Sequence, residues 1–129
     1  MPQENVEIVK RVDALLCASD IDGALACFDQ EVEWRALGPD PGASAGGRGI
    51  DSLRAHWRPF ADVPDEYLMG VLVLTMEVGE YIDRGAYVVC VGRDAPDADA
   101  YEFKDGKIVR ATFGHPSKAD ALQAVGLEE

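Results

Sequence analysis

The 129-residue sequence contains few cysteines and histidines, and each shortage argues against a class of site. Its three cysteines, Cys17, Cys27 and Cys90, are an odd number without CxxC spacing, which argues against a disulfide framework and a structural zinc site. The two histidines, His56 and His115, lie far apart and form no HExxH motif. We therefore expect no metal and no cofactor, and we expect the cysteines to be small buried side chains.

Positive charge is also scarce. Lys and Arg number 12 against 24 Asp and Glu, which gives a formal net charge of −12. Such a surface repels nucleic-acid phosphates and anionic lipid headgroups, so we expect no nucleic-acid partner and no membrane partner. The longest nearly uninterrupted apolar run, 67–76, is too short to span a bilayer. The N-terminus has neither the basic nor the apolar region of a signal peptide, and we expect a cytoplasmic protein.

The pattern of apolar residues predicts one domain over residues 1–129, with helices first and strands later. The 38–49 tract, with five glycines and two prolines, predicts a loop. Asp105-Gly106 predicts a tight hairpin turn between two strands. The expected helices are 5–18, 20–28, 50 to about 60 (ended by Pro59 and Pro64) and 117–125; the expected strands are 32–36, 68–78, 86–91, 101–103 and 108–113.

This order is typical of an α+β fold in which one curved antiparallel sheet buries the apolar faces of the helices. Segments 68–78 and 86–91 are apolar on both alternating faces, so each needs a cover on both sides. The helices can supply one cover. We expect a second copy of the chain to supply the other, which makes the protein a homodimer.

Five segments, taken in order and spacing, resemble the SnoaL-like, ketosteroid-isomerase-like family of the nuclear-transport-factor-like (NTF2-like, cystatin-like) superfamily. They are ENVEIVKRV (4–12), DIDGALACFDQEVEW (20–34), GRGIDSLR (47–54), FKDGKIVR (103–110) and ADALQAVGL (119–127). The resemblance implies a cone-shaped half-barrel closed by about three helices of the N-terminal half, with a short C-terminal helix and a pocket inside the cone.

The resemblance also implies two kinds of function. One is cofactor-independent proton-transfer chemistry on an apolar metabolite, of the isomerase, cyclase, dehydratase or epoxide-hydrolase type. The other is a non-catalytic ligand-binding or dimeric interaction module of the same fold. Ketosteroid isomerases use a general-base Asp, a Tyr and a second, protonated Asp. The matching positions here are Ala36, Val12 and Asp99, so steroid isomerisation by that mechanism is not expected.

Asp99 is the first candidate catalytic residue. Strand alternation places it on one face with Tyr101 and Phe103, where a carboxyl beside aromatic rings can act as acid, base or hydrogen-bond donor, assisted by Tyr101. The competing interpretation is a solvated acid in the loop that also carries Asp94 and Asp97.

His56 is the third candidate catalytic residue, because it lies beside the apolar stripe of the third helix and titrates near neutral pH. The competing interpretation is a partly buried histidine bonded to the backbone. His115 either reaches the pocket rim or lies in the turn before the last helix. Large aromatic side chains serve equally well as core or as pocket wall. The candidate ligand-pocket residues are Val12, Leu16, Trp34, Ala36, Trp57, Phe60, Phe103 and His115.

Overall fold

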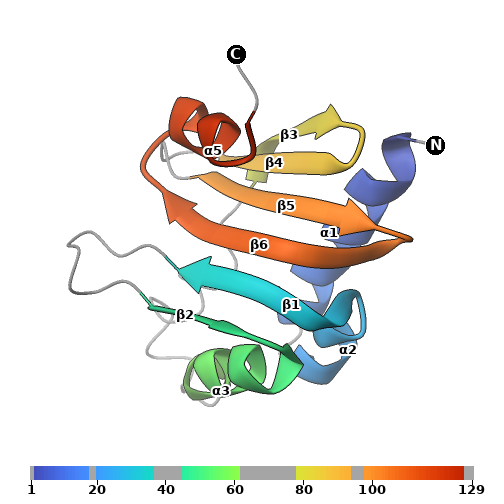
Figure 1. Ribbon diagram of the computed structural model, residues 1–129, viewed down its shortest axis with the longest axis vertical. Coiled ribbons are helices and arrows are strands. Elements are labelled where there is room, and N and C mark those ends of the chain that lie inside the picture. Colours follow the sequence, from blue (N-terminus) through green and yellow to red (C-terminus); the bar gives the residue numbers. More distant parts are fainter. Residues whose placement is uncertain (1, 18–19, 37–44, 62–77, 94–97, 127–129) are drawn as a thin grey trace.

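The computed structural model describes residues 2–17, 20–36, 45–61, 78–93 and 98–126, and within these ranges it leaves out the side chains of 2–3, 16–17, 45 and 57–61 (Figure 1). Its elements are α1 (Pro2–Cys17), α2 (Ile21–Leu25), β1 (Phe28–Ala36), β2 (Ala45–Arg48), α3 (Ile50–Ala61), β3 (Val78–Arg84), β4 (Tyr87–Gly92), β5 (Ala98–Lys104), β6 (Lys107–His115) and α5 (Lys118–Ala124).

The described strands form one curved, unclosed sheet in the order β2-β1-β6-β5-β4-β3. Every neighbouring pair is antiparallel except β1 and β6, which run parallel. Helices α1 and α2 precede the strands, α3 lies between β2 and β3, and the short α5 follows the last strand (Figure 1). The α+β class and the half-barrel architecture expected from the sequence are confirmed.

Different helices pack on the two faces of the sheet. We call the face toward α1, α2 and α3 the inner face, and the face toward α5 the outer face. Apolar side chains on the inner face pack with the buried residues of the first helices. The inner-face core comprises Val9, Val12, Ala24, Leu25, Phe28, Val32, Trp34, Leu53, Val88, Cys90, Tyr101, Phe103, Ile108 and Ala111. The outer-face core, under α5, comprises Ile82, Val89, Ala98, Ala100, Ala121 and Leu122.

The hairpin turn forms as the sequence predicts, and polar side chains cap the starts of two helices. Asp105 and Gly106 have φ of 53° and 78°, so the turn between β5 and β6 uses the left-handed region that Asp-Gly tolerates. Asp20 accepts a hydrogen bond from the Gly23 N–H at the start of α2. Ser117 does the same for the Asp120 N–H at the start of α5.

Two features differ from the prediction by more than a shift of about three residues at an end. The strand expected at 32–36 begins at Phe28, so Phe28 belongs to β1 and Cys27 lies in the preceding turn rather than in a helix. A strand, β2, lies inside the predicted 38–49 loop, because pairing with β1 holds the glycine-rich segment extended. Helix α3 includes Pro59 and ends at Ala61, close to the predicted end at about residue 60.

Strand β3 was not predicted, because its sequence VGEYIDR alternates poorly between apolar and polar residues. It begins at Val78, whereas the strand expected over 68–78 lies almost wholly outside the described residues. Strand β4 is apolar on both faces as predicted. Its Val88 and Cys90 lie in the inner-face core and its Val89 lies in the outer-face core under α5. The chain thus covers β4 itself, and this strand requires no second copy.

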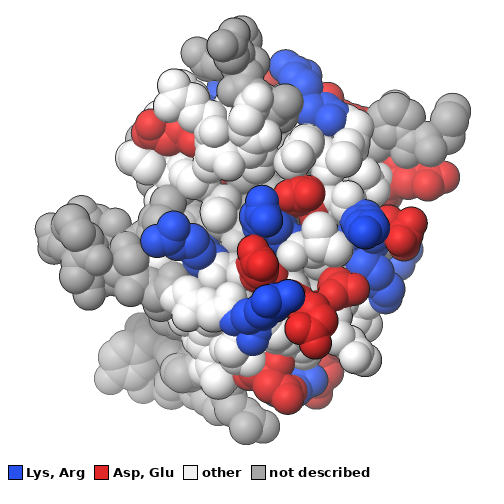
Figure 2. Space-filling view, in the orientation of Figure 1, with Lys and Arg blue, Asp and Glu red and all other residues white. Residues whose placement is uncertain are grey.

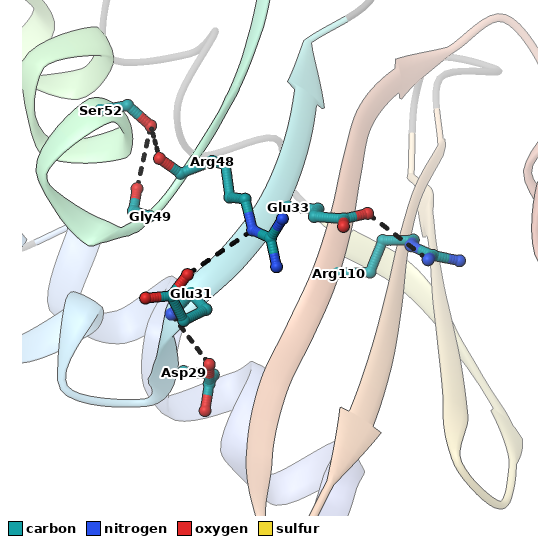
Figure 3. Close-up of polar contacts among 7 residues, drawn as sticks. All are labelled: Asp29, Glu31, Glu33, Arg48, Gly49, Ser52 and Arg110. Carbon is teal, nitrogen blue, oxygen red and sulfur yellow. Dashed lines mark hydrogen bonds and ion pairs between the residues drawn. The ribbon is translucent and has the colours of Figure 1, made fainter.

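Beyond α5, charged side chains cover the outer face (Figure 2). Arg110 of β6 lies between Glu33 of β1 and Glu102 of β5, and each N···O distance is 3.4 Å. Arg48 of β2 lies 3.6 Å from Glu31 of β1. Figure 3 shows the Arg48 side chain reaching Glu31 and the Glu33 side chain reaching Arg110 across neighbouring strands. This charge ladder, Glu31, Glu33, Arg48, Glu102 and Arg110, alternates in sign across the sheet.

The packing of α5 predicts a large cost for truncating its buried leucine. Leu122 is 1% exposed against the outer-face core, so Leu122→Ala is expected to lower the free energy of unfolding by about 2–5 kcal/mol. Gln123→Ala, at the exposed neighbouring position, is the matched control and should change stability by less than about 0.5 kcal/mol. Urea denaturation measures both. Equal midpoints for the two variants would show that α5 does not cover the sheet.

Candidate functional site

Three side chains with titratable groups form a row across the inner face of the sheet. Tyr81 of β3 pairs with Cys90 of β4, and Cys90 pairs with Asp99 of β5. Side chains at paired positions lie on the same face, and Cys90 belongs to the inner-face core. We call Tyr81, Cys90 and Asp99, together with Asp13 of α1, the inner row.

Asp13 joins the row from helix α1. The Tyr81 hydroxyl donates a hydrogen bond to Asp13 Oδ2 at 2.9 Å. Val9 and Val12 bury one stripe of α1 against the sheet, and Asp13 lies at the border of that stripe. The Asn5 amide donates to the Gly85 carbonyl at 2.8 Å and so ties the start of α1 to the β3–β4 turn. These contacts fix the helix over the strand that carries Tyr81.

Burial changes the chemistry of the Asp13 carboxyl. Desolvation raises its pKa from 3.8 to about 6, and the hydrogen bond from Tyr81 partly opposes this rise. A carboxyl with a pKa close to neutral can take a proton from a bound molecule and return it, which is the requirement for a general acid or base.

Tyr101 lies next to the row on β5 and is 4% exposed. Burial raises the pKa of its hydroxyl well above the ordinary value, and the nearby acidic groups of Asp99, Cys90, Asp13 and Tyr81 raise it further. The hydroxyl therefore stays protonated and is a donor. Its ring meets that of Phe113 edge-on, with the centroids 6.0 Å apart.

Asp99 lies in strand β5 and not in a loop. Ala98 pairs with His115 and Ala100 with Thr112, so β6 has one extra residue opposite Asp99. The Gly114 N–H in this bulge donates to Asp99 Oδ1 at 2.8 Å. Gly114 has a φ of 81°, which favours glycine at this position. The bulge thus holds the Asp99 carboxylate in one orientation.

His56 and Trp34 lie toward the other side of the inner face, on α3 and β1. Their ring centroids are 4.6 Å apart at 35°. Burial lowers the pKa of His56, so its imidazole is neutral at pH 7. The Trp34 Nε1–H donates to the Ser52 hydroxyl at 2.7 Å, and this hydroxyl lies within hydrogen-bond distance of the Arg48 and Gly49 carbonyls (Figure 3). Both rings are thereby held against the start of α3.

Glycine at position 47 is required by this contact. A Cβ there would lie 2.9 Å from Ser52 Oγ and 3.1 Å from Trp34 Nε1. Only a residue without a side chain allows β2 to approach the Trp34–Ser52 pair so closely.

The remaining candidate residues lie in three places. Val12, Phe103 and the partly buried Ala36 belong to or contact the inner-face core. His115 lies across the sheet: its pairing partner Ala98 belongs to the outer-face core, and its Nε2 lies 2.7 Å from Thr112 Oγ1. Burial lowers the pKa of His115, partly opposed by Asp120 of α5. The side chains of Leu16, Trp57 and Phe60 lie outside the described residues.

Sequence reasoning missed Asp13, Tyr81 and Cys90 as site residues. In the sequence, Asp13 is one of several polar residues beside the apolar stripe of a helix, and nothing marks it as a site residue. Tyr81 lies on the strand that was not predicted. Their proximity depends on a contact between residues 68 positions apart. Among the described residues, no group of three or more His, Cys, Asp or Glu is placed to hold a metal ion. No described helix is both long enough and apolar enough to cross a membrane.

Comparisons with known proteins identify the fold. No family model and no curated protein match this sequence. Among solved structures, an NTF2-like protein of unknown function from Burkholderia pseudomallei is 19% identical with a TM-score of 0.64, and the match covers 95% of this chain and 98% of that one. A cystatin-fold protein from Novosphingobium aromaticivorans is 16% identical with a TM-score of 0.58, covering 86% and 97%.

A third solved structure is that of a protein co-crystallised with a small molecule. TerC, co-crystallised with polyporic acid, is 20% identical with a TM-score of 0.61, and the match covers 84% of this chain and 88% of TerC. At these identities the likeness concerns architecture. The chain has the NTF2-like fold.

The raised pKa of Asp13 predicts a specific pH dependence of stability. Below about pH 4 the carboxyl is protonated in both the folded and the unfolded state, whereas above about pH 6 the folded chain bears the cost of burying its charge. The contribution of Asp13 to the free energy of unfolding is therefore most favourable at low pH and is lost as the pH rises from about 4 to about 6. The loss is at most about 3 kcal/mol.

Asp13→Asn removes this titration and keeps an acceptor for Tyr81. The difference in unfolding free energy between this variant and wild type should therefore increase in favour of the variant from pH 4 to pH 7. Chemical denaturation at several pH values measures it. Asp105→Asn, in the exposed hairpin turn, corrects for the loss of one charge. A difference that does not change with pH contradicts the burial of Asp13.

Proposed function

We propose that the protein binds a small, largely apolar metabolite against the inner face of the sheet and transfers a proton on it without a cofactor. The observation that carries the proposal is the partly buried Asp13 carboxyl, hydrogen-bonded to Tyr81, near the buried side chain of Tyr101. An acceptor for a substrate proton and a donor to a substrate oxygen are the two parts that isomerisation, cyclisation or dehydration requires.

Each residue has a stated role in this proposal. Asp13 takes and returns the proton. Tyr81 orients the carboxyl through the 2.9 Å hydrogen bond. Tyr101 donates to the oxygen on which negative charge develops. Asp99, whose orientation Gly114 fixes, is the second carboxyl of the site. His56, neutral and stacked on Trp34, contacts the far end of the molecule.

Steroid isomerisation by the known three-residue mechanism is not part of this proposal. The positions that match the catalytic base and tyrosine are Ala36 and Val12, and Val12 is 1% exposed within the inner-face core. Neither residue can accept or donate a proton.

The aromatic side chains on the inner face favour a second candidate function, the binding of a flat molecule without chemistry. Trp34, Tyr101 and Phe113 lie on neighbouring strands β1, β5 and β6 of this face. Such rings supply apolar contact area for a planar ligand. That TerC was crystallised with polyporic acid supports ligand binding on this fold.

Hydrogen exchange on ketones separates the two functions. A panel of uncharged cyclic ketones in D₂O is expected to take up deuterium at the α-carbon, measured by NMR. Asp13→Asn should lower the rate by about 10²-fold or more, because a positioned general base contributes 10²–10⁴. Glu102→Gln, on the outer face of β5, is the control and should leave the rate unchanged. Ketones that bind without exchanging would favour the non-catalytic function.

The proposal includes a cytoplasmic location and a homodimer. The acidic composition and the free thiols Cys27 and Cys90 support the location. The charge ladder of the outer face supports the dimer, because rows of alternating sign are self-complementary when a second copy is rotated by two-fold symmetry.

Light scattering tests the dimer at micromolar concentration. The expected mass is twice the 13.9 kDa of one chain. Arg110→Glu would bring three acids together with Glu33 and Glu102 and should shift the protein toward the monomer. Lys104→Glu, at the exposed end of β5, makes the same charge change outside the ladder and should not. A wild-type mass near that of one chain contradicts the homodimer.

A further inference from the structure

One extra residue in β6 decides which side chains at the end of this strand reach the inner face. Thr112 pairs with Ala100 of β5, and His115, three residues later, pairs with Ala98, only two residues away from Ala100. Without the extra residue, strand alternation would point His115 to the inner face. The bulge instead brings it opposite Ala98 of the outer-face core. Phe113 is thus the last side chain of β6 on the inner face.

Asp99 holds this bulge from the facing strand. It lies between Ala98 and Ala100, opposite Phe113 and Gly114. The extra residue of a bulge loses its place in the regular ladder of backbone hydrogen bonds, so its N–H needs another acceptor. Asp99 Oδ1 accepts the Gly114 N–H at 2.8 Å. Gly114 has a φ of 81°, a conformation that a residue with a Cβ rarely adopts. The carboxylate and the glycine together stabilise the bulge in this form.

The bulge places the Phe113 ring against Tyr101. Tyr101 pairs with Ala111, two residues before Phe113, and diagonal neighbours at this spacing are within reach of aromatic side chains. The two rings meet edge-on, with their centroids 6.0 Å apart and their planes at 75°. On its other side Phe113 pairs with Ala36 of β1, so two strands determine its position. Because Tyr101 is 4% exposed, a displaced Phe113 would leave an unfilled space beside the tyrosine ring.

Asp99 therefore has two routes to Tyr101, which lies two residues later on β5. One route is electrostatic: burial raises the pKa of the Tyr101 hydroxyl, and the Asp99 carboxylate adds to the rise. The other route is a chain of contacts from Asp99 to Gly114, and from the adjoining Phe113 to Tyr101. The electrostatic route is shared with Asp13, whereas the contact with Gly114 belongs to Asp99.

We propose that Asp99 is a positioning residue: by holding Gly114 in the bulge, it keeps the Phe113 ring against Tyr101 and so fixes the place of the Tyr101 side chain on the inner face. Its effect on the reaction rests on the proposed function, in which Tyr101 donates to the oxygen on which negative charge develops. Asp99 then acts on the reaction through Tyr101 and transfers no proton itself. Asp13 remains the acid and base of the site.

Three variants separate the position of Tyr101 from the charge of Asp99. Asp99→Asn removes the charge and keeps an acceptor for the Gly114 N–H, so the bulge should persist. Gly114→Ala keeps the charge but places a Cβ at a φ of 81°, which strains the bulge. Asp99→Ala removes both the charge and the acceptor.

Asp29→Ala is the matched control. Asp29 accepts a 2.8 Å hydrogen bond from the backbone N–H of Glu31, at the end of β1 that is far from Ala36 and its partner Phe113. The control thus removes the same kind of contact between a carboxylate and the backbone, away from Tyr101.

Nuclear Overhauser effects (NOEs) between ring protons measure the contact of Phe113 with Tyr101 in protein labelled on phenylalanine and tyrosine. Tyr101→Phe and Phe113→Leu identify the signals. The NOE should be present in the wild type, in Asp99→Asn and in Asp29→Ala. It should be lost in Asp99→Ala and in Gly114→Ala. A protein that is destabilised but still folded keeps this contact, so the NOE reports position rather than stability.

The deuterium exchange of the cyclic ketones measures the consequence for the reaction. Because a displacement of about 1 Å costs up to about 10²-fold in rate, Asp99→Ala and Gly114→Ala should exchange at least about tenfold more slowly than Asp99→Asn. Asp29→Ala should match the wild-type rate. Should Asp99→Ala not fold, the comparison of Asp99→Asn with Gly114→Ala decides alone.

The results distinguish this inference from the proposed function. If Asp99→Asn loses the NOE while Gly114→Ala keeps it, the charge of Asp99 controls Tyr101 and the positioning role is wrong. An NOE that persists in all these variants also overturns it. If the wild type exchanges no ketone, the proposed proton transfer fails, while the NOEs still decide whether Asp99 positions Tyr101.

Discussion

The contact between helix α1 and the β3–β4 hairpin determines where the site forms. Val9 and Val12 are buried against the sheet, and the Asn5–Gly85 and Tyr81–Asp13 hydrogen bonds fix the helix along the edge strand. Because Asp13 lies at the border of the buried stripe, the same packing that stabilises the fold takes its carboxyl out of water. The cost of that desolvation is what moves its pKa toward neutrality.

The sheet separates two kinds of polar surface. On the outer face, acids and bases alternate and neutralise one another in solvent, where each pair contributes little to stability. On the inner face, the acidic groups and hydroxyls of the inner row and Tyr101 lie beside a largely apolar core. Strand alternation produces this division directly, since Glu102 and Asp99 are three residues apart on β5 and point to opposite faces.

Much of the fold could be read from local patterns. The hairpin at Asp105-Gly106 and the helices predicted over 5–18 and 117–125 depend on interactions within a few residues, and all three form close to the predicted positions. Strand β2 was missed because glycine has little preference for a strand, and only pairing with β1 extends it. The sequence also predicted that Tyr101 and Phe103 on β5 lie on the same, inner face, because residues two apart in a strand point to the same side of the sheet.

The sequence by itself determined the α+β class, the excess of acids and the face that Asp99 shares with Tyr101, because composition, periodicity and turn chemistry are local properties. Only the tertiary structure decided which of those residues meet. Asp13 comes to Tyr81 across 68 positions of chain, and the bulge at Gly114 fixes Asp99. His115 goes to the outer face, where α5 covers its neighbours. These outcomes depend on strand register and helix docking, and such long-range packing leaves no repeating signal in the sequence.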